Sequence, residues 1–121
     1  MITLTKILEV VSAAYVIDTE LLKSKQRTRQ LVIPRQVYCY FARYYAKEST
    51  TKIGKEINRD HSTVLHSIKE INSKLSVHKG EEDLNIMVNH IQDKLNKIKK
   101  YTKNDEKLIP SYVNLIEMCN N

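Results

Sequence analysis

Tryptophan is absent from this sequence of 121 residues, which has only two glycines, two prolines and two cysteines. An all-β fold needs turn residues every ~8–12 positions, so the scarcity of glycine and proline argues against one. Cys39 and Cys119 lack CxxC spacing, which argues against a zinc motif or a disulfide framework and fits a reduced cytoplasmic setting. Neither GxxxxGKS/T nor GxGxxG occurs, so we expect no bound ATP, dinucleotide or other cofactor.

Long apolar runs and catalytic groupings are missing as well. The longest apolar runs are a few residues long, against the roughly 20 needed to span a bilayer. The N-terminal apolar stretch carries Glu9 and has no basic segment before it, so we expect neither a membrane span nor a signal peptide. No Ser/His/Asp or paired-carboxylate arrangement stands out, so we expect a protein that is not an enzyme and has no small-molecule substrate.

The positive charge of the chain is gathered in one stretch. Lysine and arginine number 20 against 14 aspartates and glutamates, a formal net charge of +6. No acidic residue lies between Glu20 and Glu48, and that stretch holds seven cations: Lys23, Lys25, Arg27, Arg29, Arg35, Arg43 and Lys47. A positive field concentrated in this way indicates a polyanionic partner.

Apolar residues recur at helical spacing along almost the whole chain. The helices expected from this spacing cover residues 3–16, 18–23, 34–47, 51–57, 61–75 and 81–100. Residues 24–33 are expected to form an extended loop, and Pro34 the first turn of the next helix. The side chains expected to face the core include Tyr44 and Leu65. We predict an all-α fold, a compact bundle of six or seven helices containing a helix-turn-helix. One domain is expected over residues 1–100, followed by a C-terminal extension over 101–121, for which a short helix packed on the body and a mobile segment are the two alternatives.

Two of the expected helices, 51–57 and 61–75, are joined by a tight polar turn and have the size and apolar spacing of a helix-turn-helix. In such units the second helix enters the major groove and its first residues face the base edges. Those residues here are Asp60, His61, Ser62 and Thr63. Their carboxylate, imidazole, hydroxyl and methyl groups can all contact base edges. The alternative is that Asp60 only caps the helix and the residues after it fill the first turn.

A strongly basic segment precedes this unit. KSKQRTR, residues 23–29, places four cations in seven residues. An arginine inserted into a narrow minor groove reads its width and potential, and neighbouring lysines and arginines hold phosphates. A solvated charge run is the alternative interpretation, but its position beside the helix-turn-helix favours binding of duplex DNA.

Several motifs within residues 21–71 match one family. They are the basic loop, the PRQ that opens the next helix, the IG of the first short helix, and RDHSTVLH, which is close to the family signature RDHTTVLH. On these motifs the chain resembles the C-terminal DNA-binding domain (domain IV) of the bacterial chromosomal replication initiator DnaA, a Trp-repressor-like helix-turn-helix domain. The resemblance extends from residue 3 to about residue 100.

The resemblance implies a role for each matched position. Arg27 matches the loop arginine that enters the minor groove, and Arg43 matches a basic phosphate-contact position. The pair of the PRQ motif that contacts the duplex falls on Arg35 and Gln36. The residues that read bases fall at the start of the second helix, with Arg59 beside them. The complete set of candidate DNA-binding residues is Lys23, Lys25, Arg27, Arg29, Arg35, Gln36, Arg43, Arg59, Asp60, His61, Ser62 and Thr63.

The sequence departs from the family pattern at three points. Ser62 replaces the usual threonine, which keeps the hydroxyl and loses a methyl that could touch thymine. Ile57 and Asn58 replace a Gly-Gly pair and the turn is one residue shorter, so the reading helix could tilt differently. The family's ATPase domain is absent from this sequence, which implies DNA binding without the machinery that melts the duplex.

We therefore predict a sequence-specific double-stranded DNA-binding protein that recognises replication-origin sites of the DnaA-box type without ATPase activity, as a monomer or weak dimer associated with the nucleoid. About five to seven neutralised phosphates predict a slope of about −4.5 to −6 for log K against the logarithm of salt concentration. Two alternative functions remain: a helix-turn-helix transcriptional regulator, and a protein that antagonises a replication initiator. Replication proteins are possible further partners besides DNA. Binding of anionic lipid is a weaker alternative. A phage, a mobile element or a bacterial chromosome would each suit such a domain.

Overall fold

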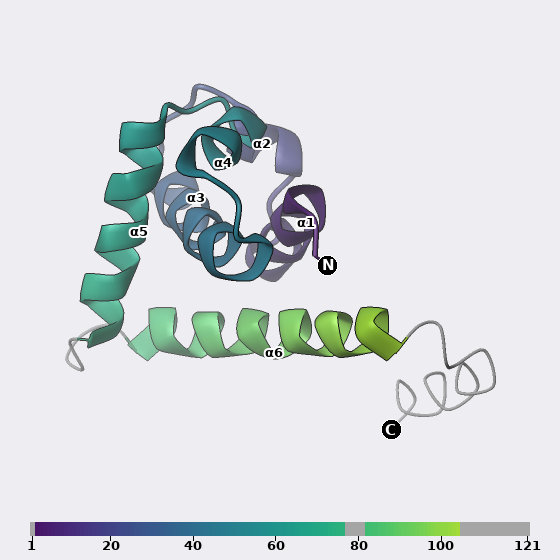
Figure 1. The fold of residues 1–121 in the computed structure, drawn as a ribbon. Helices are drawn as coiled ribbons and strands as arrows, with labels where there is room; N and C mark the ends of the chain where they lie inside the picture. Colours follow the sequence, from purple (N-terminus) through teal and green to yellow (C-terminus); the bar gives the residue numbers. More distant parts are fainter. Residues whose placement is uncertain (1, 77–81, 105–121) are drawn as a thin grey trace.

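The computed structural model describes residues 2–76 and 82–104. Over these two ranges the chain forms six α-helices and one π-helical turn without any β-strand, so the all-α prediction is confirmed. The elements in chain order are α1 (Leu4–Tyr15), α2 (Thr19–Lys23), α3 (Arg29–Phe41), the π-helical turn (Ala42–Ala46), α4 (Thr50–Glu56), α5 (His61–Ser76) and α6 (Glu82–Asn104). Figure 1 shows α6 running across one end of the bundle and α5 along one side of it.

One hydrophobic core receives side chains from all six helices. The i, i+3, i+4 spacing of α1 places Ile7, Leu8 and Val11 in this core, each 2% exposed or less. Helix α6 packs on α1 through a buried stripe made of Leu84, Val88, Ile91 and Leu95. Burial of each such aliphatic side chain contributes about 1.5–3 kcal/mol, so α6 is an integral part of the bundle.

The start of α3 differs from the prediction. The helix begins at Arg29 after the N-cap Thr28, and the amide of Leu31 donates to the Thr28 carbonyl at 3.0 Å. Pro34 therefore lies inside the helix, not in its first turn, and the loop predicted over 24–33 shortens to five residues. Leu31 is only 4% exposed. The burial of Leu31 in the core favours a helix that begins more than one turn before Pro34. This gain outweighs the one backbone hydrogen bond that Pro34 removes inside the helix.

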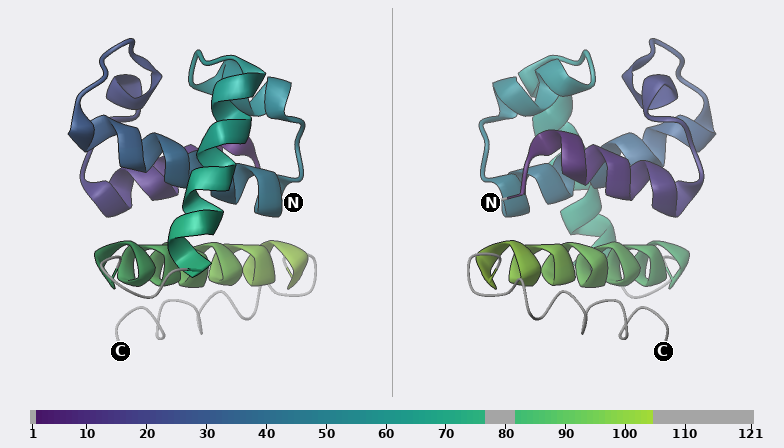
Figure 2. Two further views of the ribbon diagram at one scale, coloured as in Figure 1. Left: turned by 90° about the vertical axis from the view of Figure 1, so that its left-hand side faces the viewer. Right: turned by 90° about the vertical axis from the view of Figure 1, so that its right-hand side faces the viewer.

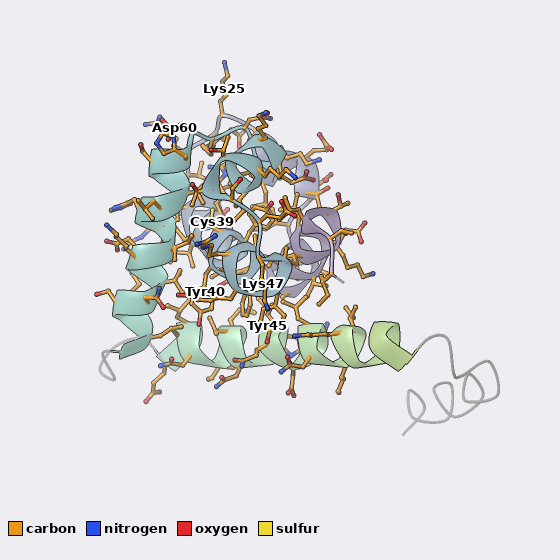
Figure 3. All side chains as sticks on the ribbon, viewed as in Figure 1. Lys25, Cys39, Tyr40, Tyr45, Lys47 and Asp60 are labelled. Carbon is orange, nitrogen blue, oxygen red and sulfur yellow. The ribbon has the colours of Figure 1, made fainter. Side chains whose placement is uncertain are left out.

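Helix α3 ends in the π-helical turn Ala42–Ala46, which carries two tyrosines in different environments. A π-helical turn holds an extra residue compared with α-helix, which rotates the following side chains about the axis. Tyr44 is 50% exposed, so the prediction that it faces the core is wrong, and its hydroxyl accepts a hydrogen bond from Asn72 Nδ2 at 3.2 Å. The Tyr45 hydroxyl donates to Asn96 Oδ1 at 2.8 Å and joins this turn to α6 (Figure 3).

The C-terminal part of the chain lies partly outside the described ranges. Helix α6 continues four residues beyond the predicted end at Lys100 and ends at Asn104. The rest of the predicted extension and the second cysteine, Cys119, lie outside the described residues. Among the helices that are described, none combines the length and the apolar character needed to cross a lipid bilayer.

Candidate nucleic-acid interface

Helices α4 and α5 and the turn between them form the predicted helix-turn-helix. Asp60 caps α5: its Oδ1 accepts a hydrogen bond from the Thr63 amide at 2.8 Å. This amide, followed by the Thr63 hydroxyl, lowers the pKa of the Asp60 carboxyl, so the carboxylate form is favoured at the helix N-terminus. The structure thus confirms that Asp60 is the N-cap of α5, and the cap fixes where this helix begins.

The tight turn depends on a close approach between two backbone segments. The Arg59 amide donates to the Gly54 carbonyl at 2.8 Å, and a Cβ added to Gly54 would collide with the Arg59 carbonyl oxygen. Asn58 adopts a left-handed conformation, with φ of 58°, which asparagine tolerates better than most residues. Ile57 and Asn58 stand where the family resemblance implies a Gly-Gly pair, and Asn58 supplies the left-handed conformation that a glycine would adopt readily.

The first turn of α5 presents its side chains to solvent. His61, Ser62 and Thr63 are exposed, whereas Val64 is fully buried. The prediction that Leu65 faces the core is wrong, because the residue is 45% exposed, three positions after Ser62 on the same outer face of α5. Sequence reasoning missed Leu65 as a candidate functional residue. The i, i+3 spacing from Ser62 was the signal that could have identified it.

The basic loop, residues 24–28 between α2 and α3, carries exposed cations at and beside it. The side chains of Lys25, Arg27 and Arg29 are exposed and make no hydrogen bond or ion pair with the part of the chain that the structure describes. Lys25 points away from the bundle, at the same end as Asp60 (Figure 3). Lys23 differs, because it is half-buried and its Nζ lies 3.9 Å from Glu56 Oε1.

Arg35 lies beneath the basic loop and not on the surface, being 6% exposed. Its Nε donates to the Leu22 carbonyl at 2.8 Å, and Nη2 donates to the Leu21 and Ser24 carbonyls, each at 2.9 Å. Its Nη1 donates to the Gln26 carbonyl. The structure therefore directs this guanidinium at the backbone of the loop, whereas the resemblance implied a contact with the duplex.

Arg59 also directs its guanidinium at backbone carbonyls. Nη2 donates to the Ser24 carbonyl at 2.8 Å, and Nη1 donates to the carbonyls of Ile57 and Asn58 at 3.2 and 3.1 Å. Burial, and then the neighbouring positive charge of Arg59, lower the pKa of Arg35. Two guanidiniums thus converge on the Ser24 carbonyl, and this end of the molecule concentrates positive charge.

The loop and the turn of the helix-turn-helix lie at the same end of the molecule, the end opposite α6 (Figure 2). Arg59 Nη2 joins them directly by donating to the Ser24 carbonyl, and Asn58 Nδ2 donates at 3.0 Å to the carbonyl of Lys23, the last residue of α2 before the loop. The structure therefore brings the basic loop and the start of α5 to one end of the molecule.

The two remaining candidates are Arg43 and Gln36, and neither belongs to the basic loop or to the turn of the helix-turn-helix. Arg43 follows Arg29 by 14 residues, about 21 Å along a helix axis, and its Nη1 donates to the Glu48 carbonyl at 3.2 Å. Gln36 is half-buried, and its Oε1 has no hydrogen-bond partner among residues 2–76 and 82–104. The side chain of Arg43 is exposed, but it does not lie beside the basic loop.

Comparison with known proteins identifies the same part of the chain as a helix-turn-helix. Residues 4–71, from α1 into α5, match the family model described as the bacterial DnaA protein helix-turn-helix. Three chromosomal replication initiator proteins DnaA are similar: 36% identical over 74% of this chain in Desulfotalea psychrophila, 40% over 65% in Bacteroides thetaiotaomicron, and 37% over 72% in Lactobacillus helveticus. The chain spans 18%, 17% and 20% of the length of these relatives, respectively.

Proposed function

Because the chain belongs to the bacterial DnaA helix-turn-helix family, we propose that it binds double-stranded DNA with the start of α5 in the major groove and the basic loop in the adjacent minor groove. The observation that carries the proposal is the direct connection between the two elements, made by Arg59 and Asn58 to the backbone of Ser24 and Lys23. Two elements held together at one end of a small domain can contact neighbouring grooves of a single duplex.

The proposed interface separates phosphate contacts from base contacts. The candidate cations with exposed side chains are Lys25, Arg27, Arg29 and Arg43. Neutralising about four phosphates gives a slope of about −3.6 for log K against the logarithm of salt concentration. This slope is shallower than the sequence-based value, because Arg35, Arg59 and Lys23 bond within the protein.

Base recognition is assigned to the outer face of α5. His61, Ser62 and Thr63 carry groups that match base edges, and exposed Leu65 adds an apolar contact suited to a thymine methyl. The matched relatives are named as chromosomal replication initiators, so we propose that the DNA site is of the replication-origin type. In this proposal the chain marks the site without enzymatic activity or a cofactor, and works where the chromosome is, at a cytoplasmic nucleoid.

Replacing Arg27 with alanine is expected to weaken binding to a duplex by about 1–2 kcal/mol, because the loop loses its minor-groove contact. Fluorescence anisotropy across a salt series measures the change. Lys99→Ala, which removes an exposed cation from the helix at the opposite end, is the matched control and should leave the affinity nearly unchanged. Equal losses in both variants would show that only net charge matters and would contradict a minor-groove contact.

Replacing His61 with alanine is expected to reduce discrimination between the selected site and random duplex by about 1–3 kcal/mol, because one base-edge contact is lost. Competition binding with both duplexes measures this difference. His90→Ala on α6 exchanges another exposed histidine and serves as the control. An equal loss on specific and random duplexes for His61→Ala would contradict the major-groove assignment.

Selection of bound sequences from a random duplex pool tests the kind of DNA site. Recovery of an initiator-type box supports a role at a replication origin or in competition with an initiator for its boxes. Recovery of an unrelated operator-like palindrome would instead support a transcriptional regulator, because such operators mirror the symmetry of a dimer.

A further inference from the structure

The backbone between Leu21 and Gln26 is held by side chains from other parts of the fold. Five carbonyl oxygens in this stretch accept hydrogen bonds from three side chains, those of Arg35, Asn58 and Arg59. The accepting carbonyls are those of Leu21, Leu22, Lys23, Ser24 and Gln26. Within this stretch only Leu22 is fully buried in the core, so these bonds are what holds the backbone on either side of it.

Arg35 is the centre of this arrangement. A guanidinium is planar and offers five N–H donors in a fixed fork, and here the three nitrogens reach four carbonyls. The residue is 6% exposed, which leaves little of its surface for a phosphate. Lysine has the same charge but a single nitrogen on a flexible chain, so it cannot reproduce this set of bonds.

The arrangement also decides which groups face the solvent. The carbonyls of Leu21, Leu22, Ser24 and Gln26 bond to buried Arg35, and Ser24 also bonds to half-buried Arg59, so the negative ends of these peptide dipoles are directed into the protein. The side chains of Lys25, Arg27 and Arg29 remain exposed on the outside. Turning carbonyls inward removes repulsion between the loop backbone and a polyanion and leaves the cations outermost.

Asn58 and Arg59 extend the same contacts to the helix-turn-helix. Asn58 holds the left-handed position of the turn, with φ of 58°, and its Nδ2 donates to the Lys23 carbonyl at 3.0 Å. A glycine there would accept the same φ but would lack the amide. Asn58 therefore provides a bond between turn and loop that the Gly-Gly form of the family pattern has no side chain to make.

We propose that Arg35, Asn58 and Arg59 form a loop clamp, a set of positioning residues that fixes the basic loop against the helix-turn-helix before DNA binds. The proposal rests on the proposed function and deepens it: Arg35 acts through Arg27 by holding the loop and does not itself contact phosphate. A loop ordered in advance loses less conformational entropy on binding, so the clamp raises affinity without adding a contact to the duplex.

A double-mutant cycle between Arg35→Lys and Arg27→Ala tests this coupling. With the clamp intact, Arg27→Ala lowers affinity for the selected duplex by ~10-fold. In the Arg35→Lys background the loop is no longer held, and the same change is expected to lower affinity by less than ~3-fold. The salt slope of Arg35→Lys should equal that of the unaltered protein, because no phosphate contact is lost. Additive losses in the cycle would overturn the clamp as a positioning device.

Amide hydrogen exchange without DNA tests the clamp independently of any binding activity. Arg35→Lys should accelerate exchange of the amides in residues 21–28 by at least ~10-fold relative to the rest of the core. Arg29→Lys, the same substitution at an exposed arginine, should leave these rates unchanged. Asn58→Gly keeps the backbone conformation and removes only the hydrogen bond to the Lys23 carbonyl, so it should accelerate amide exchange in the same segment by a smaller factor. This second variant keeps the test decisive if Arg35→Lys fails to fold.

The two measurements separate failure of the clamp from failure of the proposed function. If the unaltered protein binds no selected or random duplex, the proposed function is wrong, and hydrogen exchange still decides whether the clamp orders the loop. Unchanged exchange of residues 21–28 in both Arg35→Lys and Asn58→Gly would overturn the clamp even if the protein binds DNA tightly.

Discussion

Replacing Gly54 with alanine is expected to destabilise the folded protein by about 3 kcal/mol, at the upper end of what an added methyl group costs in a tightly packed site. The added Cβ would collide with the Arg59 carbonyl oxygen and would also lie 3.3 Å from Val64 Cγ2. The obstacle is backbone, which cannot move aside without shifting the turn that positions α5. Denaturation by urea, followed by circular dichroism, gives the change in free energy of unfolding.

The control for this variant lies in the same helix. Thr51→Ala changes an exposed residue of α4 to a better helix former and should alter the free energy of unfolding by less than ~0.5 kcal/mol. If Gly54→Ala were as stable as Thr51→Ala, the result would contradict the close contact between Gly54 and the Arg59 carbonyl.

Truncation of Leu95 to alanine is expected to lower the free energy of unfolding by about 3–4 kcal/mol. Leu95 is fully buried in the stripe of α6 that packs against the bundle, and a leucine-to-alanine change there removes apolar contacts and leaves a cavity. The family match ends at residue 71, so this variant tests whether the helix beyond it shares the same core. Thermal and urea unfolding provide the measurement.

Ile86 offers a matched comparison on α6, because it is also a large aliphatic residue but is 67% exposed. Ile86→Ala should change stability by less than ~0.5 kcal/mol. If Leu95→Ala cost no more than Ile86→Ala, α6 would not be held by its buried stripe. A large loss for Leu95→Ala with a single unfolding transition would instead show that α6 and the rest of the bundle unfold together.

The periodic pattern predicted the helices well where one face of a helix meets the core. The stripe of α6 and the apolar face of α1 follow from spacing alone, because burial repeats with the period of the helix. The prediction failed at Pro34, where local chemistry indicated a helix start but the burial of Leu31 extends the helix backwards. It failed again at Tyr44, because a π-helical turn changes the period and its position depends on tertiary packing.

The candidate site was predictable in its location but not in the roles of its residues. Charge density and the signature motif indicated the loop and the start of α5, and the structure places both at one end. Nothing in the sequence distinguishes an arginine that faces a phosphate from one that bonds to carbonyls. Arg35 and Arg59 differ from Arg27 only in what surrounds them, and the carbonyls that they bind within residues 21–26 lie 9 to 35 residues away. That proximity exists only in the folded chain.

The clamp and the outer face of α5 use different residues, and this separation affects how the protein can evolve. Among the described residues, the side chains of Ser62 and Leu65 take part in no hydrogen bond or ion pair, and both point into solvent. Substitutions at these positions leave the architecture untouched. In the proposed binding mode, exchanging a few outward-facing groups of α5 would therefore change the preferred DNA sequence, while the cations proposed to bind the phosphate backbone stay the same.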